Sequence, residues 1–315
     1  MNLLPDAAQQ ALVDAAEAVL SSGDADPAVR FAAWAGQGLF APAASLTELS
    51  LLGRTLGRHL ATGPYLGTAL AVRLAAAGGH DHLAEELAAG RRPVALAQPV
   101  DRAAPEGRLL VFDDPRAPLV LVVTPAGATL HPTGGTTPVA RHGLDPLVPM
   151  AETELARPAL AGTEGDRPFL EGTLLAAALA AGLAEATRDR SAAHARTREQ
   201  FGRPIGTFQA VAHRCAAMAI RAEAATCQVS FAALSLDAAE PDAPLQVAAA
   251  KVVAVDAAIH NATDDIQNHG AAGCSAEDDA HLYLKRAWVT EHLFGPSHRH
   301  LGALAGAPAL QEAPA

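Results

Sequence analysis

The sequence predicts a mainly α-helical protein with a small β domain between two helical regions. Half of its 315 residues are apolar, alanine is the most frequent of them, and only 4% are aromatic. Alanine is the best helix former, and its small side chain lets helices pack closely. The middle of the chain is rich in proline, glycine and short β-branched runs, which favour turns and strands. We therefore expect an N-terminal helical domain over 1–91, a middle β domain over 92–166 and a C-terminal four-helix bundle over 167–315.

Four helices are expected in the N-terminal domain. Residues 3–20 carry apolar side chains at helical spacing. Ser45 and Glu48 form a capping box, so a second helix should begin there and run to about Leu60. Two further helices are predicted over 67–77 and 80–89.

The middle domain shows the pattern of a small antiparallel sheet. Short runs of apolar and β-branched residues cover 94–96, 109–112 and 119–123. Turn-forming residues separate them, at 113–115 and at 133–135.

The C-terminal domain has the pattern of long packed helices. Apolar or small residues recur at alternating steps of three and four, which is typical of left-handed bundle packing. Four helices are predicted, and the last should stop at Gly295-Pro296; they cover about 169–198, 206–236, 243–269 and 277–293.

Composition argues against several classes of protein. The formal net charge is -11, with no block of lysine and arginine, so a nucleic acid would be repelled. The N-terminus lacks the basic start and apolar run of a secretory signal, and no run of about 18 apolar residues predicts a membrane span. The three separated cysteines are expected to be buried, reduced thiols, so we expect a cytoplasmic protein.

Histidine and lysine side chains give no strong sign of chemistry. The pairs His80/His82 and His298/His300 lack a carboxylate or cysteine that would complete a ligand set, so no metal site is expected. Lys251 lies beside the apolar seam of the third bundle helix. We expect its stem to lie along the protein surface with its ammonium in water.

Two loops that join the predicted bundle helices are unusual. The first, 198–209, places an arginine, an aromatic ring and two glycines at a helix start. Such a helix N-terminus can bind a diphosphate, or the loop can be a plain turn with Phe201 in the core. The second, 266–275, has glycines just after a helix, either as a C-cap or to let a ligand approach closely.

Taken together, these loops resemble those of the acyl-CoA dehydrogenase family. The family carries R-x-x-F-G…FQ at the first loop, as in Arg198, Phe201-Gly202 and Phe208-Gln209 here. It carries Q-x-x-G-G-x-G at the second, which Gln267 to Gly273 matches in part. The segment 279–286 is similar to the family's last long helix, and the chain resembles its short actinobacterial members. The resemblance is tight over about 169–304 and looser before it.

The resemblance implies a fold and an activity. Family members have a helical N-terminal domain, a middle antiparallel β-barrel-like domain and a four-helix bundle. A glutamate removes a proton from the α-carbon of an acyl-CoA thioester, and a hydride passes from the β-carbon to FAD. The two loops reach the adenosine diphosphate half of an FAD that is bound mainly by the adjoining subunit. By resemblance, the residues that line this half are Arg198, Gln200, Phe201, Phe208, Gln209, Gln267 and Gly270.

The sequence departs from the family where the flavin ring is bound. The family's T-E-P-x-x-G-S-D contacts the isoalloxazine ring, but the corresponding stretch 96–102 lacks the Gly-Ser pair. In the second loop Ala271 replaces the second glycine. The missing Gly-Ser pair removes ring contacts, whereas the change at Ala271 would cost only about 1 kcal/mol if that position needs positive φ, so the adenosine diphosphate contacts are expected to remain.

The family's acid–base residues are also missing. Phe294 stands where many members have the glutamate, and a phenyl ring cannot accept a proton. Other members take the base from the first bundle helix, at the position of Gly172. Glu171 is a candidate base one residue away, rotated by about 100° on the helix; its other interpretation is a first-turn carboxylate that favours the helix dipole. A family arginine that binds substrate aligns with Thr173.

Three hypotheses follow from this pattern. The first is one subunit of a heteromeric, FAD-dependent acyl-CoA dehydrogenase, whose larger partner supplies the base and the ring contacts. The family includes such short-plus-long assemblies, often for sterol side chains or other unusual acyl-CoAs, with a separate electron-transfer acceptor. The second is a homodimeric dehydrogenase that uses Glu171. The third is a flavin-free scaffold or interaction protein with the same fold.

Overall fold

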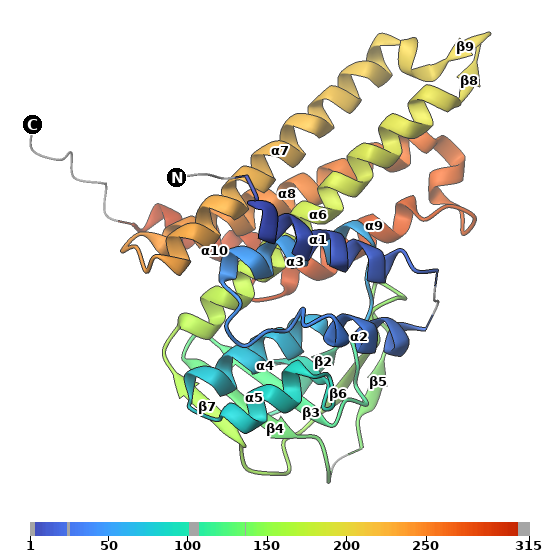
Figure 1. Cartoon of the computed structure of the whole chain (residues 1–315). Helices are drawn as coiled ribbons and strands as arrows, with labels where there is room; N and C mark the ends of the chain where they lie inside the picture. The colour runs from blue at the N-terminus through green and yellow to red at the C-terminus, as the bar shows by residue number, and fades with distance from the viewer. Residues whose placement is uncertain (1–3, 24–25, 101–106, 136, 308–315) are drawn as a thin grey trace, which may run out of the picture.

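The N-terminal part of the chain is helical and lies against both the bundle and the sheet (Figure 1). The computed structural model describes residues 4–23, 26–100, 107–135 and 137–307. The helices of this part are α1 (Ala7–Leu20), α2 (Pro27–Gly36), α3 (Leu46–Arg58), α4 (Tyr65–Ala77) and α5 (Asp81–Ala88). The helix α2 was not expected, although Asp26 caps it and Pro27 occupies its first turn, which is a common helix start.

The start of α3 joins this part to the bundle. The predicted capping box is confirmed, because the Ser45 hydroxyl accepts from the Glu48 N–H and Glu48 accepts from the Ser45 N–H. A second carboxylate, Asp237, accepts hydrogen bonds from the N–H groups of Leu46 and Thr47, at 2.8 and 2.9 Å. Asp237 is the last residue of a bundle helix. The first turn of α3 is therefore capped both by its own Ser45 and by a carboxylate of the bundle.

The middle of the chain forms one seven-stranded sheet in the order β5-β6-β2-β1-β3-β4-β7. Its strands are β1 (Val94–Pro99), β2 (Leu109–Phe112), β3 (Leu119–Thr124), β4 (Gly127–Pro132), β5 (Val139–Arg141), β6 (Met150–Thr153) and β7 (Ala161–Glu164).

The expectation of an antiparallel, barrel-like sheet is wrong in two respects. First, β1 and β3 pair in parallel, because the chain leaves β2 and crosses to the far side of β1. Second, β5 and β7 are not paired with each other in the described part of the chain, so the sheet is open.

The C-terminal part is the expected helical bundle. Its elements are α6 (Arg167–Thr197), β8 (Glu199–Gln200), β9 (Arg203–Pro204), η1 (Ile205–Thr207), α7 (Gln209–Asp237), α8 (Ala243–His269), η2 (Gly270–Cys274), α9 (Ala280–His292) and α10 (Ser297–Ala305). The short helix α10 was missed, because Gly295-Pro296 is a turn between two helices and not the end of the helical region.

The helices α3 and α6 touch backbone to backbone. A Cβ atom on Gly182 would lie 2.0 Å from the carbonyl oxygen of Arg54, and one on Gly57 would lie 2.1 Å from that of Leu179. Only glycine fits at such distances. This crossing fixes the N-terminal helices on the bundle.

Two stretches, α6 and 243–274, are long and apolar enough to cross a membrane by length and composition. In α6 the most apolar window is 78% buried inside the protein. Buried core helices of a bundle have this composition, so the two stretches are weak evidence for a membrane span.

The cysteines are less buried than expected. Cys227 and Cys274 are exposed and Cys215 is half-buried. All three are free thiols.

Candidate functional site

The first loop is a tight hairpin at the far end of α6. The strands β8 and β9 are joined by Phe201 and Gly202, whose φ angles are 54° and 77°. Two positive φ angles in a two-residue loop define a type I′ turn, which is strained for phenylalanine. The side chain of Phe201 is 92% exposed, so the interpretation that places it in the core is wrong. An exposed aromatic ring held by a strained backbone is a candidate ligand contact.

The helix start after this hairpin carries the other predicted groups. Phe208 precedes α7, which has no side-chain cap, so its first N–H groups are available to an anion. The Phe208 ring packs edge-on to Phe201, at 6.0 Å between centroids, and under the Arg203 guanidinium at 4.2 Å. Gln209 is exposed, and Gln200 donates to the carbonyl of Glu199. Arg198 is exposed, and within the described residues its guanidinium has no hydrogen bond or ion pair.

The second loop lies beside the first at the same end of the bundle. The helix α8 ends at His269, and Gly270 follows with φ 66°. The rings of His269 and His194 lie 4.1 Å apart, and His194 is in the last turn of α6, four residues before Arg198. Gln267 and Gly270 are both exposed. The φ of Ala271 is not positive, so this replacement of a family glycine causes no backbone strain.

A cluster of charged side chains lies next to the two loops. Arg190 donates to Asp278 at 2.9 Å and to the fully buried Asp265 at 3.4 Å. Burial raises the pKa of Asp265 to about 6, although His269 and Arg190 act in the opposite direction. Burial and the neighbouring His269 lower the pKa of His194. The lowered pKa favours the neutral form of His194, and a neutral imidazole can stack on the His269 ring without charge repulsion.

A cavity of about 590 Å³ lies at the other end of α6, between the sheet and the bundle. This volume is within the range of small-molecule sites. Its wall is mostly apolar, with a few polar groups; among its lining residues are Gln98, Thr124, Phe169, His292, Phe294 and Arg299. Part of the stretch 96–102 lines it through Gln98, Pro99 and Val100, while Asp101 and Arg102 lie outside the described residues.

The two positions at which the family resemblance would place a base lie against each other beside this cavity, and Phe294 lines it. A Cβ atom on Gly172 would lie 2.3 Å from the Phe294 ring, so Phe294 rests directly on the backbone of α6. Phe169 packs edge-on to the same ring, at 6.1 Å between centroids. A phenyl ring against a glycine has no group that can take a proton.

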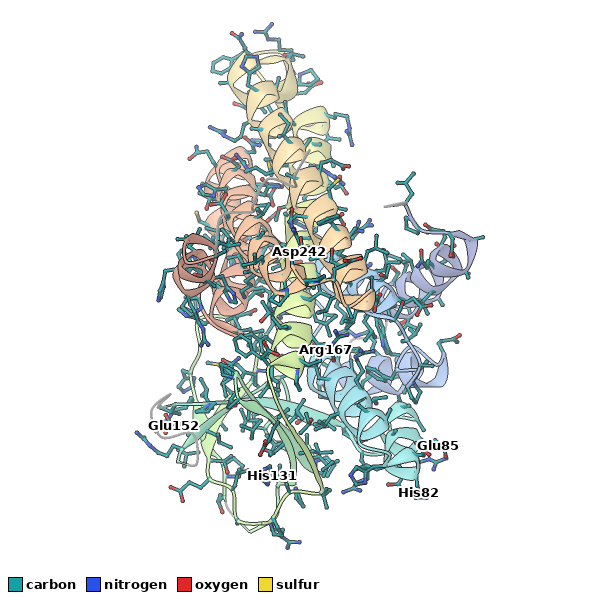
Figure 2. All side chains as sticks on the ribbon, turned by 90° about the vertical axis from the view of Figure 1, so that its left-hand side faces the viewer. His82, Glu85, His131, Glu152, Arg167 and Asp242 are labelled. Atoms are coloured by element: carbon teal, nitrogen blue, oxygen red, sulfur yellow. The ribbon has the colours of Figure 1, made fainter. Side chains whose placement is uncertain are left out.

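Glu171 faces another way and is held by two arginines. Arg73 donates to both of its oxygens, at 2.9 and 2.8 Å, and Arg167 donates at 2.9 Å. Figure 2 shows Arg167 where the bundle meets the half that bears the sheet. Burial alone would raise the pKa of Glu171, but Arg73 and Arg167 outweigh it and lower the pKa below its ordinary value. A carboxylate in this state is a weak proton acceptor, so the geometry favours a structural role for Glu171.

We expect Glu171→Gln to reduce stability without affecting chemistry. The free energy of unfolding in urea should fall by about 1–3 kcal/mol, because the half-buried Arg73 loses its counter-charge and the more exposed Arg167 loses its ion pair. In the wild type this stabilisation is complete above the ordinary glutamate pKa of 4.5 and is lost as the pH falls through the lower folded-state pKa. The exposed Glu85→Gln is the control (Figure 2). A loss of kcat of about 100-fold or more in an active preparation would instead make Glu171 the base.

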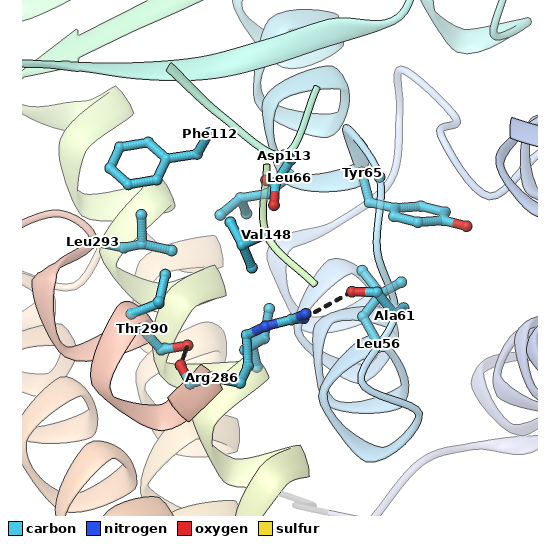
Figure 3. Close-up of a pocket in the computed structure, with 13 residues that line it drawn as sticks. Leu56, Ala61, Tyr65, Leu66, Phe112, Asp113, Val148, Arg286, Thr290 and Leu293 are labelled. Atoms are coloured by element: carbon cyan, nitrogen blue, oxygen red, sulfur yellow. Dashed lines mark hydrogen bonds between the residues drawn. The ribbon is translucent and has the colours of Figure 1, made fainter. Parts of the chain in front are cut away.

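A second pocket, of about 40 Å³, is too small for a coenzyme (Figure 3). It has room for a few water molecules. Arg286 lines it and donates to the Ala61 carbonyl and to Asp145, at 2.8 and 2.5 Å. Asp113 also faces it, and burial raises the pKa of Asp113 to about 6. The larger cavity and the two loops therefore remain the candidate ligand sites.

The fold thus has two candidate ligand sites: the largely apolar cavity, and the bundle tip, which is formed by the loops 198–209 and 266–275. Residues 167–307 match the family model described as acyl-CoA dehydrogenase, C-terminal domain. The chain is 33% identical over 251 residues to acyl-CoA dehydrogenase IpdE2 of Mycobacterium tuberculosis, covering 77% of this chain and 71% of IpdE2. It is 35% identical over 295 residues to acyl-CoA dehydrogenase FadE34 of the same organism. That match covers 86% of this chain but only 41% of FadE34.

The chain belongs to the acyl-CoA dehydrogenase family. Members of this family are FAD-dependent oxidoreductases that act on CH–CH bonds. Among solved structures, the fold is similar to a chain in the ChsE4–ChsE5 complex from Mycobacterium tuberculosis, with a TM-score of 0.80 and 23% identity. That likeness covers 98% of this chain and 100% of the other, and it concerns the fold.

Proposed function

We propose that the chain is one subunit of an FAD-dependent acyl-CoA dehydrogenase, and that its bundle tip completes the FAD site of a larger partner subunit. The substrate is then an acyl-CoA thioester, and the electrons leave to a separate acceptor protein. We further propose that the assembly is a cytoplasmic heterotetramer.

The observation that carries this proposal is the length of α6. This helix has 31 residues, so it spans about 46 Å. Phe169 at the cavity is in its first turn, and Arg198 at the tip follows its last residue. An extended FAD molecule is much shorter than this helix and cannot reach both places in one chain. The tip also projects away from the sheet into solvent (Figure 1). A nucleotide at the tip and a ligand in this chain's cavity would therefore belong to different molecules, which supports a tip that contacts an FAD seated mostly in another polypeptide.

The tip has the donors and the ring that an adenosine diphosphate needs. Arg198 can pair with phosphate, the uncapped start of α7 can donate N–H groups, and Phe201 can pack on adenine. Gly270 leaves space beside the backbone, since nothing lies within 4 Å of the position of its absent Cβ. When bound, FAD supplies the acceptor for the hydride.

The proton acceptor has to come from elsewhere. Phe294 and Gly172 fill the two positions where a base would lie, and Glu171 is bound to two arginines. A larger subunit with its own glutamate would supply this group. The relatives support two units: about three fifths of FadE34 lies outside the match to this chain, and ChsE4–ChsE5 was solved as a complex of two proteins.

Co-expression tests the proposal. The chain alone should purify without flavin absorbance near 450 nm and without activity. Together with a longer co-encoded acyl-CoA dehydrogenase it should form a complex with bound FAD that oxidises acyl-CoA. A yellow, active preparation of the chain alone would support the homodimer with Glu171 instead. A chain that never gains flavin with any such partner would support the flavin-free scaffold.

A further inference from the structure

Among the described residues, the largest charged side chain that is fully buried is Lys251. It is fully buried on α8, so the expectation of an ammonium in water is wrong. Its Nζ donates to the carbonyl oxygens of Thr290 and of Leu293, the second at 2.9 Å. No carboxylate of the described residues forms an ion pair with it. A buried ammonium is costly, so its two hydrogen bonds must hold something in place.

The two carbonyls belong to the end of α9 and the turn that follows. The last carbonyls of a helix have no partner within the helix and carry partial negative charge, so an ammonium is a suitable cap. The turn has positive φ at Phe294, 56°, and at Gly295, 95°. The phenylalanine conformation is strained and persists only where its surroundings enforce it.

A second buried side chain holds the same turn. His300 on α10 lies with its Nε2 3.1 Å from the Phe294 carbonyl oxygen. Glu291 fixes the start of α10 by accepting from the N–H and the hydroxyl of Ser297, at 2.8 and 2.6 Å. The titratable groups near Lys251 are thus Glu291 and, from α10, His300, whose own pKa is lowered by burial and by Lys251. Burial lowers the pKa of Lys251 to about 7, and Glu291 opposes this shift.

This turn places the residue that closes the cavity. Phe294 rests on Gly172 and against Phe169, and it lines the 590 Å³ cavity with Gly295. We propose that Lys251 is a positioning residue for the candidate site: it holds the turn 293–295 so that Phe294 forms one wall of the cavity and sets which ligand fits. The effect of Lys251 on ligand fit rests on the proposed function. Its stabilisation of the turn 293–295 does not.

Hydrogen exchange of the main-chain amides tests whether Lys251 stabilises the turn 293–295. Lys251→Met keeps the length and removes the donors, and we expect the amides of residues 293–297 to exchange at least tenfold faster. The matched control is Asn261→Leu. Asn261 is also fully buried on α8 and donates to two main-chain carbonyls, those of Ala184 and Met218, each at 3.0 Å. This control should destabilise the whole protein without faster exchange confined to the turn.

Unchanged exchange of the turn in Lys251→Met, or equal loosening by Asn261→Leu, would overturn the proposal. If Lys251→Met does not fold, Lys251→Gln replaces it, since an amide has fewer donors than the ammonium and no charge. The same outcomes are expected for it, at smaller size.

The effect on the ligand is measured in the assembled dehydrogenase with its acyl-CoA substrate. Lys251→Met should raise KM at least fivefold and leave kcat within twofold. The turn 293–295 shapes the wall of the cavity but takes no part in the transfer of the substrate proton. Asn261→Leu should leave both within twofold. Unchanged KM in Lys251→Met would remove the role in ligand fit. Failure to assemble a flavoenzyme would contradict the proposed function alone, because the exchange result needs neither flavin nor partner.

Discussion

Gly182→Ala is expected to cost about 3 kcal/mol or more of the free energy of unfolding, because α3 and α6 then cannot approach. The added Cβ would lie 2.0 Å from the Arg54 carbonyl oxygen, an atom of the backbone that cannot move without moving α3. The same movement would strain the hydrogen bonds that the Asp237 carboxylate accepts from the first N–H groups of α3. Urea unfolding followed by circular dichroism measures the loss.

Gly302→Ala is the matched control for this experiment. Gly302 lies inside α10, and nothing is within 4 Å of the position of its absent Cβ. Alanine there should stabilise the protein by up to about 1 kcal/mol, since it is the better helix former. Equal effects of the two changes would show that α3 and α6 do not cross at Gly182.

Arg198→Ala should weaken the retention of FAD in the assembled dehydrogenase by about 10- to 100-fold. Loss of one charge-assisted hydrogen bond to phosphate costs about 1.5–3 kcal/mol, which corresponds to this change in affinity. The measurement is the flavin released during dilution, followed by its fluorescence. Because the larger subunit is unchanged, any difference in FAD release reports the contribution of the bundle tip of this chain.

Arg196→Ala separates the local contact from the overall charge. Arg196 is exposed in the last turn of α6 and has the same charge, but the family resemblance gives it no contact with the nucleotide. Its replacement should change FAD retention less than about twofold, as expected for an exposed charge. If both variants release FAD equally, the effect is one of net charge and the assignment of Arg198 is wrong.

Local signals in the sequence predicted most of the helices, although not α2 and α10, and the two loops. The capping box at Ser45, the three-and-four spacing of the bundle helices and the glycines of both loops each depend on neighbours within a few residues. The order of the strands depends on pairings between distant segments. The parallel pair of β1 and β3 therefore could not be read from three apolar runs, which looked like successive hairpins.

The parts of the site that were missed are contacts across long stretches of sequence. Lys251 next to an apolar seam has the pattern of a surface residue, and its burial against the end of α9 and the turn that follows is visible only in the fold. The sequence predicted that Phe294 replaces the family's catalytic glutamate. The contact between Phe294 and Gly172 could be seen only in the folded structure. His194 and His269 show no shared motif, yet their rings stack where the two loops meet.

The uninterrupted helix α6 also joins the cavity wall to the hairpin as a single rod. Because it has no break, any tilt at one end would be carried to the other. For a rod of about 46 Å, a tilt of one degree at its base displaces the far end by about 0.8 Å. A small adjustment around Phe169 is therefore magnified at Phe201, and the strained turn there would sense a change whose origin lies at the opposite end of the molecule.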